Sequence, residues 1–167
     1  MKKLNKALLC AAMLSAACSA HAVESHIRLY TNVDTSLALL RADGSALPDL
    51  IELTHIPGQG LNTVTERVRI YTNDEDKDVE VRLLNAPSLV PKSGTGTPVP
   101  MSVSLNKREL TVAAQDFLAN DLYDGALAGA SAIMDLDIAQ ATRAPIAVAG
   151  EYEGIVSIVM AQKAVSP

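Results

Sequence analysis

Residues 23–33 alternate between two kinds of position with a period of two. One set of positions is nearly apolar and comprises Val23, Ser25, Ile27, Leu29, Thr31 and Val33, and the other is polar and comprises Glu24, His26, Arg28, Tyr30 and Asn32. Alternation of this kind is typical of a β-strand that buries one face. The pattern therefore predicts a long strand here, whose apolar face needs a groove to cover it.

The remainder of the chain continues as short segments with the same period, separated by Gly, Pro, Asn and Asp. Strands are predicted at 50–54, 64–72, 79–83, 99–105, 109–113, 133–138 and 150–160, a short helical stretch at 114–122, and loops at 87–100, 125–131 and 143–148. A series of short strands with turn residues between them favours an all-β sandwich. No internal repeat and no linker divides the chain, so we expect one domain.

The first 22 residues have the pattern of a secretory signal peptide. Three lysines precede an apolar stretch from Ala7 to Ala17, and Ala20-His21-Ala22 fits a small-x-small cleavage site. The stretch is too short to span a bilayer as a helix. Lipoprotein processing before Cys18 is the alternative, but Ser15 stands where such signals usually carry Leu. We predict cleavage between Ala22 and Val23.

Cleavage there changes the cysteine count and the charge. Both cysteines, Cys10 and Cys18, lie in the signal, so the 145-residue mature chain has none and forms no disulfide. Loss of the three signal lysines leaves 11 basic residues against 19 acidic ones, a net charge of −8. Nucleic acid and anionic membranes are poor partners for such a chain, and we expect no nucleic-acid binding.

Candidate chemistry is sparse. The run Asp74-x-Asp76-x-Asp78 resembles the start of a calcium loop, but Val79 and Asn85 stand where that loop needs Gly and Glu. The mature chain has two histidines, His26 and His55, too few for a zinc site without cysteine. No nucleophile elbow or phosphate loop is present. We therefore expect no catalytic residue, no metal site and no cofactor.

Several motifs together resemble one family. They are Val23-Glu24 with the strand that follows, Leu39-Leu40-x-Ala42-Asp43-Gly44-x-Ala46-Leu47-Pro48, Thr72-Asn73-Asp74, Pro100-Met101-Ser102-Val103-Ser104, and Gly150-x-Tyr152-x-Gly154-x-Val156-Ser157-x-Val159-Met160. In this order and spacing they resemble the major subunits of the alpha-fimbriae, which include the colonization factor antigen fimbriae and are similar to cable pilins. The resemblance covers the whole mature chain.

The resemblance implies an immunoglobulin-like sandwich that lacks its last strand. Residues 1–22 are then the signal peptide, 23–35 a donor strand and 36–167 the incomplete domain. The donor strand of a neighbouring copy completes each domain, with Ile27, Leu29, Thr31 and Val33 inserted. The C-terminal strand is expected to border the groove through Tyr152, Ile155, Val156, Ile158 and Val159.

The resemblance also implies partners and a location. We expect a major shaft subunit that supports adhesion to host surfaces and polymerises head-to-tail. A periplasmic chaperone, an outer-membrane usher and a tip adhesin are its other expected partners, with transit through the periplasm to a cell-surface fimbria. One departure from the family is Thr35, where Pro often follows the donor strand. The alternative function is an exported β-sandwich binding module with a self-complete fold.

Overall fold

The computed structural model describes residues 37–163, which lie in a compact unit spanning residues 34–167. The strands are β1 (Ala38–Arg41), β2 (His55–Ile56), β3 (Gly60–Leu61), β4 (Val64–Tyr71), β5 (Val79–Leu83), β6 (Ser88–Pro91), β7 (Val99–Leu105), β8 (Arg108–Leu110), β9 (Gln115–Phe117), β10 (Met134–Gln140), β11 (Tyr152–Glu153) and β12 (Ile158–Gln162). The helix α2 (Ala119–Leu122) is a single turn. Across the described residues, no helix has the length and hydrophobicity needed to cross a membrane.

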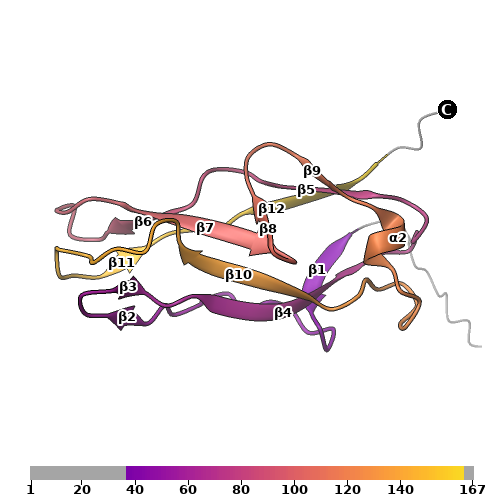
Figure 1. The fold of residues 1–167 in the computed structure, drawn as a ribbon, viewed down its shortest axis with the longest axis horizontal. Helices are drawn as coiled ribbons and strands as arrows, with labels where there is room; N and C mark the ends of the chain where they lie inside the picture. Colours follow the sequence, from indigo (N-terminus) through magenta and orange to yellow (C-terminus); the bar gives the residue numbers. More distant parts are fainter. Residues whose placement is uncertain (1–36, 164–167) are drawn as a thin grey trace, which may run out of the picture. The chain divides into compact units, whose positions relative to one another are not determined.

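The strands form two sheets and a small hairpin (Figure 1). In the first sheet the order is β1-β4-β10-β7-β6-β11, with β8 also paired to β7, and in the second it is β12-β5-β9. All these pairings are antiparallel, and β2 pairs with β3. The all-β sandwich expected from the sequence is confirmed.

The core lies between the inner faces of the two sheets. The period-two pattern accounts for it directly, because every second residue of β5, β7 and β10 is buried. Fully buried side chains come from both sheets: Val68, Ile70, Val103 and Leu105 from the first, and Val79 and Val81 from the second. With one phenylalanine and no tryptophan in the chain, the core is built mainly from aliphatic side chains.

Two predictions of local structure were wrong because the presence or absence of a partner strand, and not the local sequence preference, decides where strands form. The stretch 114–122 was expected to be helical, but residues 115–117 form β9 at the edge of β5, where Phe117 lies opposite Val79. Arg108 stacks on the Phe117 ring at 4.4 Å from its centroid, and only the last part of the stretch is the helix α2. The segment 50–54, expected to be a strand, finds no partner strand and forms none.

Two segments predicted as loops contain residues that pair with a strand. The Pro- and Gly-rich stretch 87–100 contains β6, which pairs with the start of β7. The small-residue stretch 125–131 was expected to be flexible, yet Ala130 and Ser131 are fully buried. Ala130 forms a bridge with Tyr71, so the segment extends the edge of β4.

Ser131 holds this segment through a buried hydroxyl. Its Oγ accepts a hydrogen bond from the Ile70 amide at 2.9 Å and donates to the Ala132 carbonyl at 2.8 Å. The Ser131 amide in turn donates to the Ile70 carbonyl at 2.8 Å. The Ser131 hydroxyl thus gives the Ile70 amide the acceptor that a neighbouring strand would otherwise supply.

We predict that Ser131→Ala lowers the free energy of unfolding by about 1–3 kcal/mol, because the buried Ile70 amide loses its acceptor. Guanidinium unfolding of the full chain, followed by circular dichroism, measures the change. The control is Ser102→Ala on the outer, half-buried face of β7, which we expect to change stability by less than about 0.5 kcal/mol. Equal unfolding midpoints for the two variants would contradict the role of Ser131.

Candidate functional site: an open groove between two sheet edges

Two strands at the sheet edges are the starting point of the site. Strand β1 pairs only with β4, and β12 pairs only with β5, among the strands that residues 37–163 form. Each therefore presents a row of backbone amide and carbonyl groups with no strand beside it. Such an edge is a template for pairing with a further strand.

The two open edges run along the same length of the sandwich. At one end, the Gln162 side chain of β12 donates to Thr72 Oγ1 at 2.7 Å, and Thr72 directly follows Tyr71, the partner of Ala38. At the other end, the segments 50–53 and 154–156 line one common cavity. A groove therefore lies between β1 with its continuation to Leu53 on one side and residues 154–162 on the other.

Half-buried aliphatic side chains line this groove. They pack against the core without being covered by it, and they are Leu37, Leu39, Leu47, Ile51, Leu53, Val156, Ile158 and Met160. In the C-terminal segment, these core-contacting residues recur with a period of two, as on one face of a strand. The groove can therefore accept a strand whose apolar side chains point inward.

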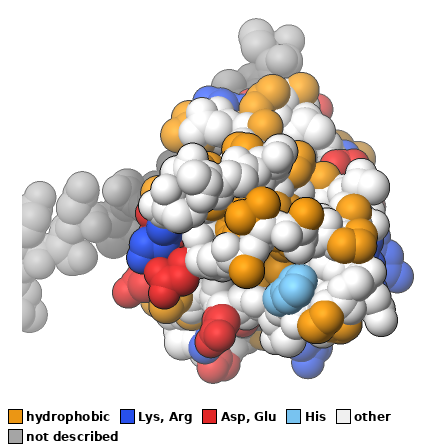
Figure 2. Space-filling model, turned by 90° about the vertical axis from the view of Figure 1, so that its left-hand side faces the viewer, with side chains coloured by type: hydrophobic (Ala, Val, Ile, Leu, Met, Phe, Trp, Pro, Cys, Tyr) orange, Lys and Arg blue, Asp and Glu red, His pale blue; other side chains and the backbone are white. Residues whose placement is uncertain are grey.

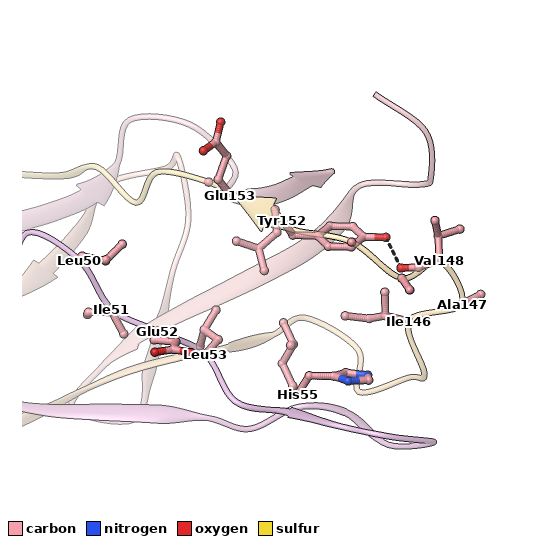
Figure 3. Close-up of a pocket in the computed structure, with 15 residues that line it drawn as sticks. Leu50, Ile51, Glu52, Leu53, His55, Ile146, Ala147, Val148, Tyr152 and Glu153 are labelled. Carbon is pink, nitrogen blue, oxygen red and sulfur yellow. Dashed lines mark hydrogen bonds between the residues drawn. The ribbon is translucent and has the colours of Figure 1, made fainter. Parts of the chain in front are cut away.

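Two cavities continue the groove at its 50–53 end. The smaller, of about 250 Å³, lies against Met101 and Ile138 of the first sheet. The larger, of about 600 Å³, is bounded by Leu50, Leu53, Ile146 and Tyr152, whose hydroxyl donates to the Val148 carbonyl at 2.9 Å (Figure 3). Figure 2 shows hydrophobic side chains gathered around a hollow with a histidine beside it at one end of the molecule.

The closing strand predicted at 150–160 is divided in the structure. Residues 152–153 form β11 and pair with β6 of the first sheet, whereas β12 starts at Ile158 and pairs with β5 of the second. The chain crosses between the sheets at Gly154, where an added Cβ would overlap the Ser88 carbonyl oxygen. Glycine permits this close approach, and the sequence pattern alone gives no sign of the crossing.

The division separates the five residues that the sequence assigned to the groove border. Val156 and Ile158 contact the core from the groove side, and Tyr152 lies at the large cavity. Val159 is half-buried in β12 on the alternate phase, whereas Ile155 is 83% exposed. The cavity walls at 50–55 and 146–150 carry no periodic signal that would have identified them in the sequence.

Two groups of ion-paired side chains lie on the elements that border the groove and the large cavity. Arg41 and Glu66 form a two-bond ion pair on the core-facing side of β1 and β4, with Nε to Oε2 at 3.2 Å and Nη2 to Oε1 at 3.3 Å. Near the large cavity, Lys92 lies 3.1 Å from Glu151 and 3.9 Å from Glu153. The hydrogen bond to Glu151, and then the two negative charges, raise the pKa of Lys92. Both glutamate side chains are largely exposed.

The groove offers a surface on which a chain can bind. Within residues 37–163, no three His, Cys, Asp or Glu side chains converge as metal ligands. Asp74 instead pairs with Lys77 at 3.0 Å, which together with the hydrogen bond from Lys77 lowers the pKa of Asp74. The predicted donor residues Ile27, Leu29, Thr31 and Val33, and the cleavage site at Ala22 and Val23, lie outside the described residues.

Comparison with known proteins agrees with the shape of the site. A sequence model of the family described as "CS1 type fimbrial major subunit" matches residues 23–161. The chain is similar to the B-type subunit of CFA/I fimbriae from Escherichia coli O78:H11, with 35% identity over 149 residues that cover 86% of this chain and 88% of the relative. It is also similar to the A-type subunit of CS1 fimbriae from Escherichia coli, with 34% identity over 166 residues that cover 95% and 97%.

A solved structure supports the same assignment. The CooA pilin subunit from enterotoxigenic Escherichia coli superposes with a TM-score of 0.68 at 32% identity, covering 77% of this chain and 88% of that one. The family match spans most of the chain, and the fold agrees with that of a pilin. The chain therefore belongs to the family of CS1-type fimbrial major subunits, the structural proteins from which such fimbriae polymerise.

Proposed function

We propose that residues 23–34 of one copy fill the open groove of the next copy, which makes the chain the polymerising shaft subunit of a fimbria. The observation that carries the proposal is the pair of open edges at β1 and β12, lined by half-buried aliphatic side chains. The inserted strand would bond its backbone to these edges and place Ile27, Leu29, Thr31 and Val33 inside. This is β-strand addition, in which main-chain bonds give affinity and alternate side chains enter pockets.

The lengths of donor and acceptor support the proposal. The core-contacting side of the C-terminal segment has Val156, Ile158 and Met160 at every second position, and Gln162 continues the phase. From Val156 to Gln162 is seven residues, as is the span from Ile27 to Val33. Burial of Ile27, Leu29 and Val33 would contribute roughly 5–9 kcal/mol before ordering costs.

The same groove suggests the route of assembly. A free subunit would expose the groove, so a periplasmic chaperone would cover it first and an outer-membrane usher would exchange the chaperone for the next donor strand. Residues 1–22 would direct export to the periplasm, and the family match begins at Val23, where cleavage is expected. A tip adhesin would end the fimbria at the cell-distal side. In this proposal the chain is a structural subunit and has no catalytic role.

A self-complete binding module is the competing function. The large cavity of about 600 Å³ is the feature that would serve it, since small-molecule sites often have such volumes. Deletion of the donor strand separates the two functions, because a binding module does not need a neighbour's strand.

We predict that deletion of residues 23–34 after the signal abolishes polymerisation, because no strand remains to fill the groove. Each form would be co-expressed with its chaperone and examined by SDS gel without boiling and by electron microscopy. The full chain is expected to give SDS-resistant ladders and filaments, and the deletion a one-to-one chaperone complex. The matched control replaces His26 and Arg28, on the polar face, with Ser and should still polymerise. Stable, chaperone-free monomers of both forms would contradict the proposal.

We further predict that Val156→Asp blocks ladder formation whereas Val112→Asp does not. Val156 contacts the core at the groove, so the donor strand would bury the new carboxylate at a cost of about several kcal/mol. Val112 is 56% exposed and lines neither cavity, so its carboxylate would stay in solvent. Circular dichroism of the purified chaperone complexes establishes that each variant folds. If folded Val156→Asp formed ladders as readily as folded Val112→Asp, the groove would lie elsewhere.

A further inference from the structure

Strand β1, which borders the groove, and its partner β4 carry an ion pair at a position where the strand pattern calls for an apolar residue. Strand β4 directs Val64, Glu66, Val68 and Ile70 toward the core. Glu66 lies opposite Leu136 of β10, which is 3% exposed, and Arg41 lies opposite Val68, which is fully buried. A carboxylate and a guanidinium on the inner face of a sandwich lower the stability of the fold, because both charges are removed from water, unless they are paired and hydrogen-bonded.

The pair retains access to solvent because the sheet edge beside it is open. The side chains of Arg41 and Glu66 are 40% and 21% exposed, although the residues opposite them, Val68 and Leu136, are buried. A strand that fills the groove would cover them. Once Arg41 and Glu66 are covered, they would still have unused hydrogen-bond donors and acceptors. A guanidinium carries five N–H donors and a carboxylate about four acceptor sites, and the two bonds between the residues use only part of these.

The pair lies between two apolar stretches of the groove. On one side, Leu39 lies opposite Ile70, two residues along both strands from the Arg41–Val68 pairing. On the other side, Val64 lies opposite Ile138, which lines the smaller cavity. The inserted face of the donor strand has a matching order, because its polar residue Thr31 is also flanked by aliphatic side chains, Leu29 and Val33.

We propose that Thr31 of the donor strand from a second copy lies over the Arg41–Glu66 pair and sets the register of insertion. This inference rests on the proposed function. The Thr31 hydroxyl would accept a hydrogen bond from Arg41 or donate one to Glu66, which offsets part of the cost of covering the pair.

Alternation by itself leaves the register ambiguous. A slip of one residue would turn the apolar face outward, so it is strongly disfavoured. A slip of two residues keeps the apolar face inward and is not excluded by alternation. It would, however, place Leu29 or Val33 over the ion pair and move the Thr31 hydroxyl into an apolar stretch. The polar contact therefore distinguishes registers that the apolar contacts do not.

A double-mutant cycle on the polymer tests the contact. The four full-length chains are the parent, Thr31→Val, the combined Arg41→Met and Glu66→Leu, and the combination of all three. Each would be assembled with its chaperone and usher, and the rate at which the ladder dissociates in SDS at a fixed elevated temperature would be measured. Thr31→Ser is the matched control, since it keeps the hydroxyl.

Thr31→Val is expected to speed dissociation about tenfold or more in the parent groove, as loss of a hydrogen bond to a charged group should. Thr31→Ser should stay within about threefold of the parent. In the groove that carries both Arg41→Met and Glu66→Leu, Thr31→Val should leave the dissociation rate unchanged or lower it. An equal effect of Thr31→Val in both grooves would overturn the contact while donor-strand polymerisation stands. Absence of a ladder from the parent chain would instead refute the proposed function.

An electron cryomicroscopy structure of the parent fimbria tests the register without any substitution. We expect the Thr31 hydroxyl within hydrogen-bond distance of Arg41 or Glu66. Leu29 or Val33 in that place would overturn the proposal.

Discussion

The open edge of β12 is the constraint on which the rest of the molecule depends. Among the strands of residues 37–163, β12 is paired on one side only, and such an edge is a template for a further strand. The remaining sandwich must therefore be well packed without that strand. Val68, Ile70, Val79 and Val81 are fully buried, so this part of the core is already covered within residues 37–163.

The kind of contact that fills the groove determines the kind of assembly. A donor segment and an acceptor groove are different surfaces of one chain, so the contact is head-to-tail and propagates as a filament. The mature chain expected from the sequence has no cysteine, so no disulfide can reinforce the joint. In the proposed fimbria, the strength of the joint would then come from the inserted strand, through its main-chain bonds and its inward side chains.

The sequence predicted the parts of the fold that depend on local alternation. Strands β4, β5, β7 and β10 follow from the period-two pattern, because each buries one face against the same core. It failed where the partner is distant in the chain: β9 is a strand because it pairs with β5, and Gly154 crosses between sheets because it passes close to Ser88. The groove has no pattern of its own, since its two rims are far apart in sequence.

Glu66 shows how a break in a pattern can carry information about assembly. In the sequence it is an acidic residue on the apolar phase of an otherwise regular strand, which alone suggests only a weak strand. The structure pairs it with Arg41, 25 residues away, at an edge that a neighbouring subunit would cover. An apolar groove binds any apolar strand of the right length, so affinity and register are separate problems. A single satisfied polar contact contributes less to affinity than the apolar burial does, but it penalises each shifted register, which is the role that a buried polar residue serves in coiled coils.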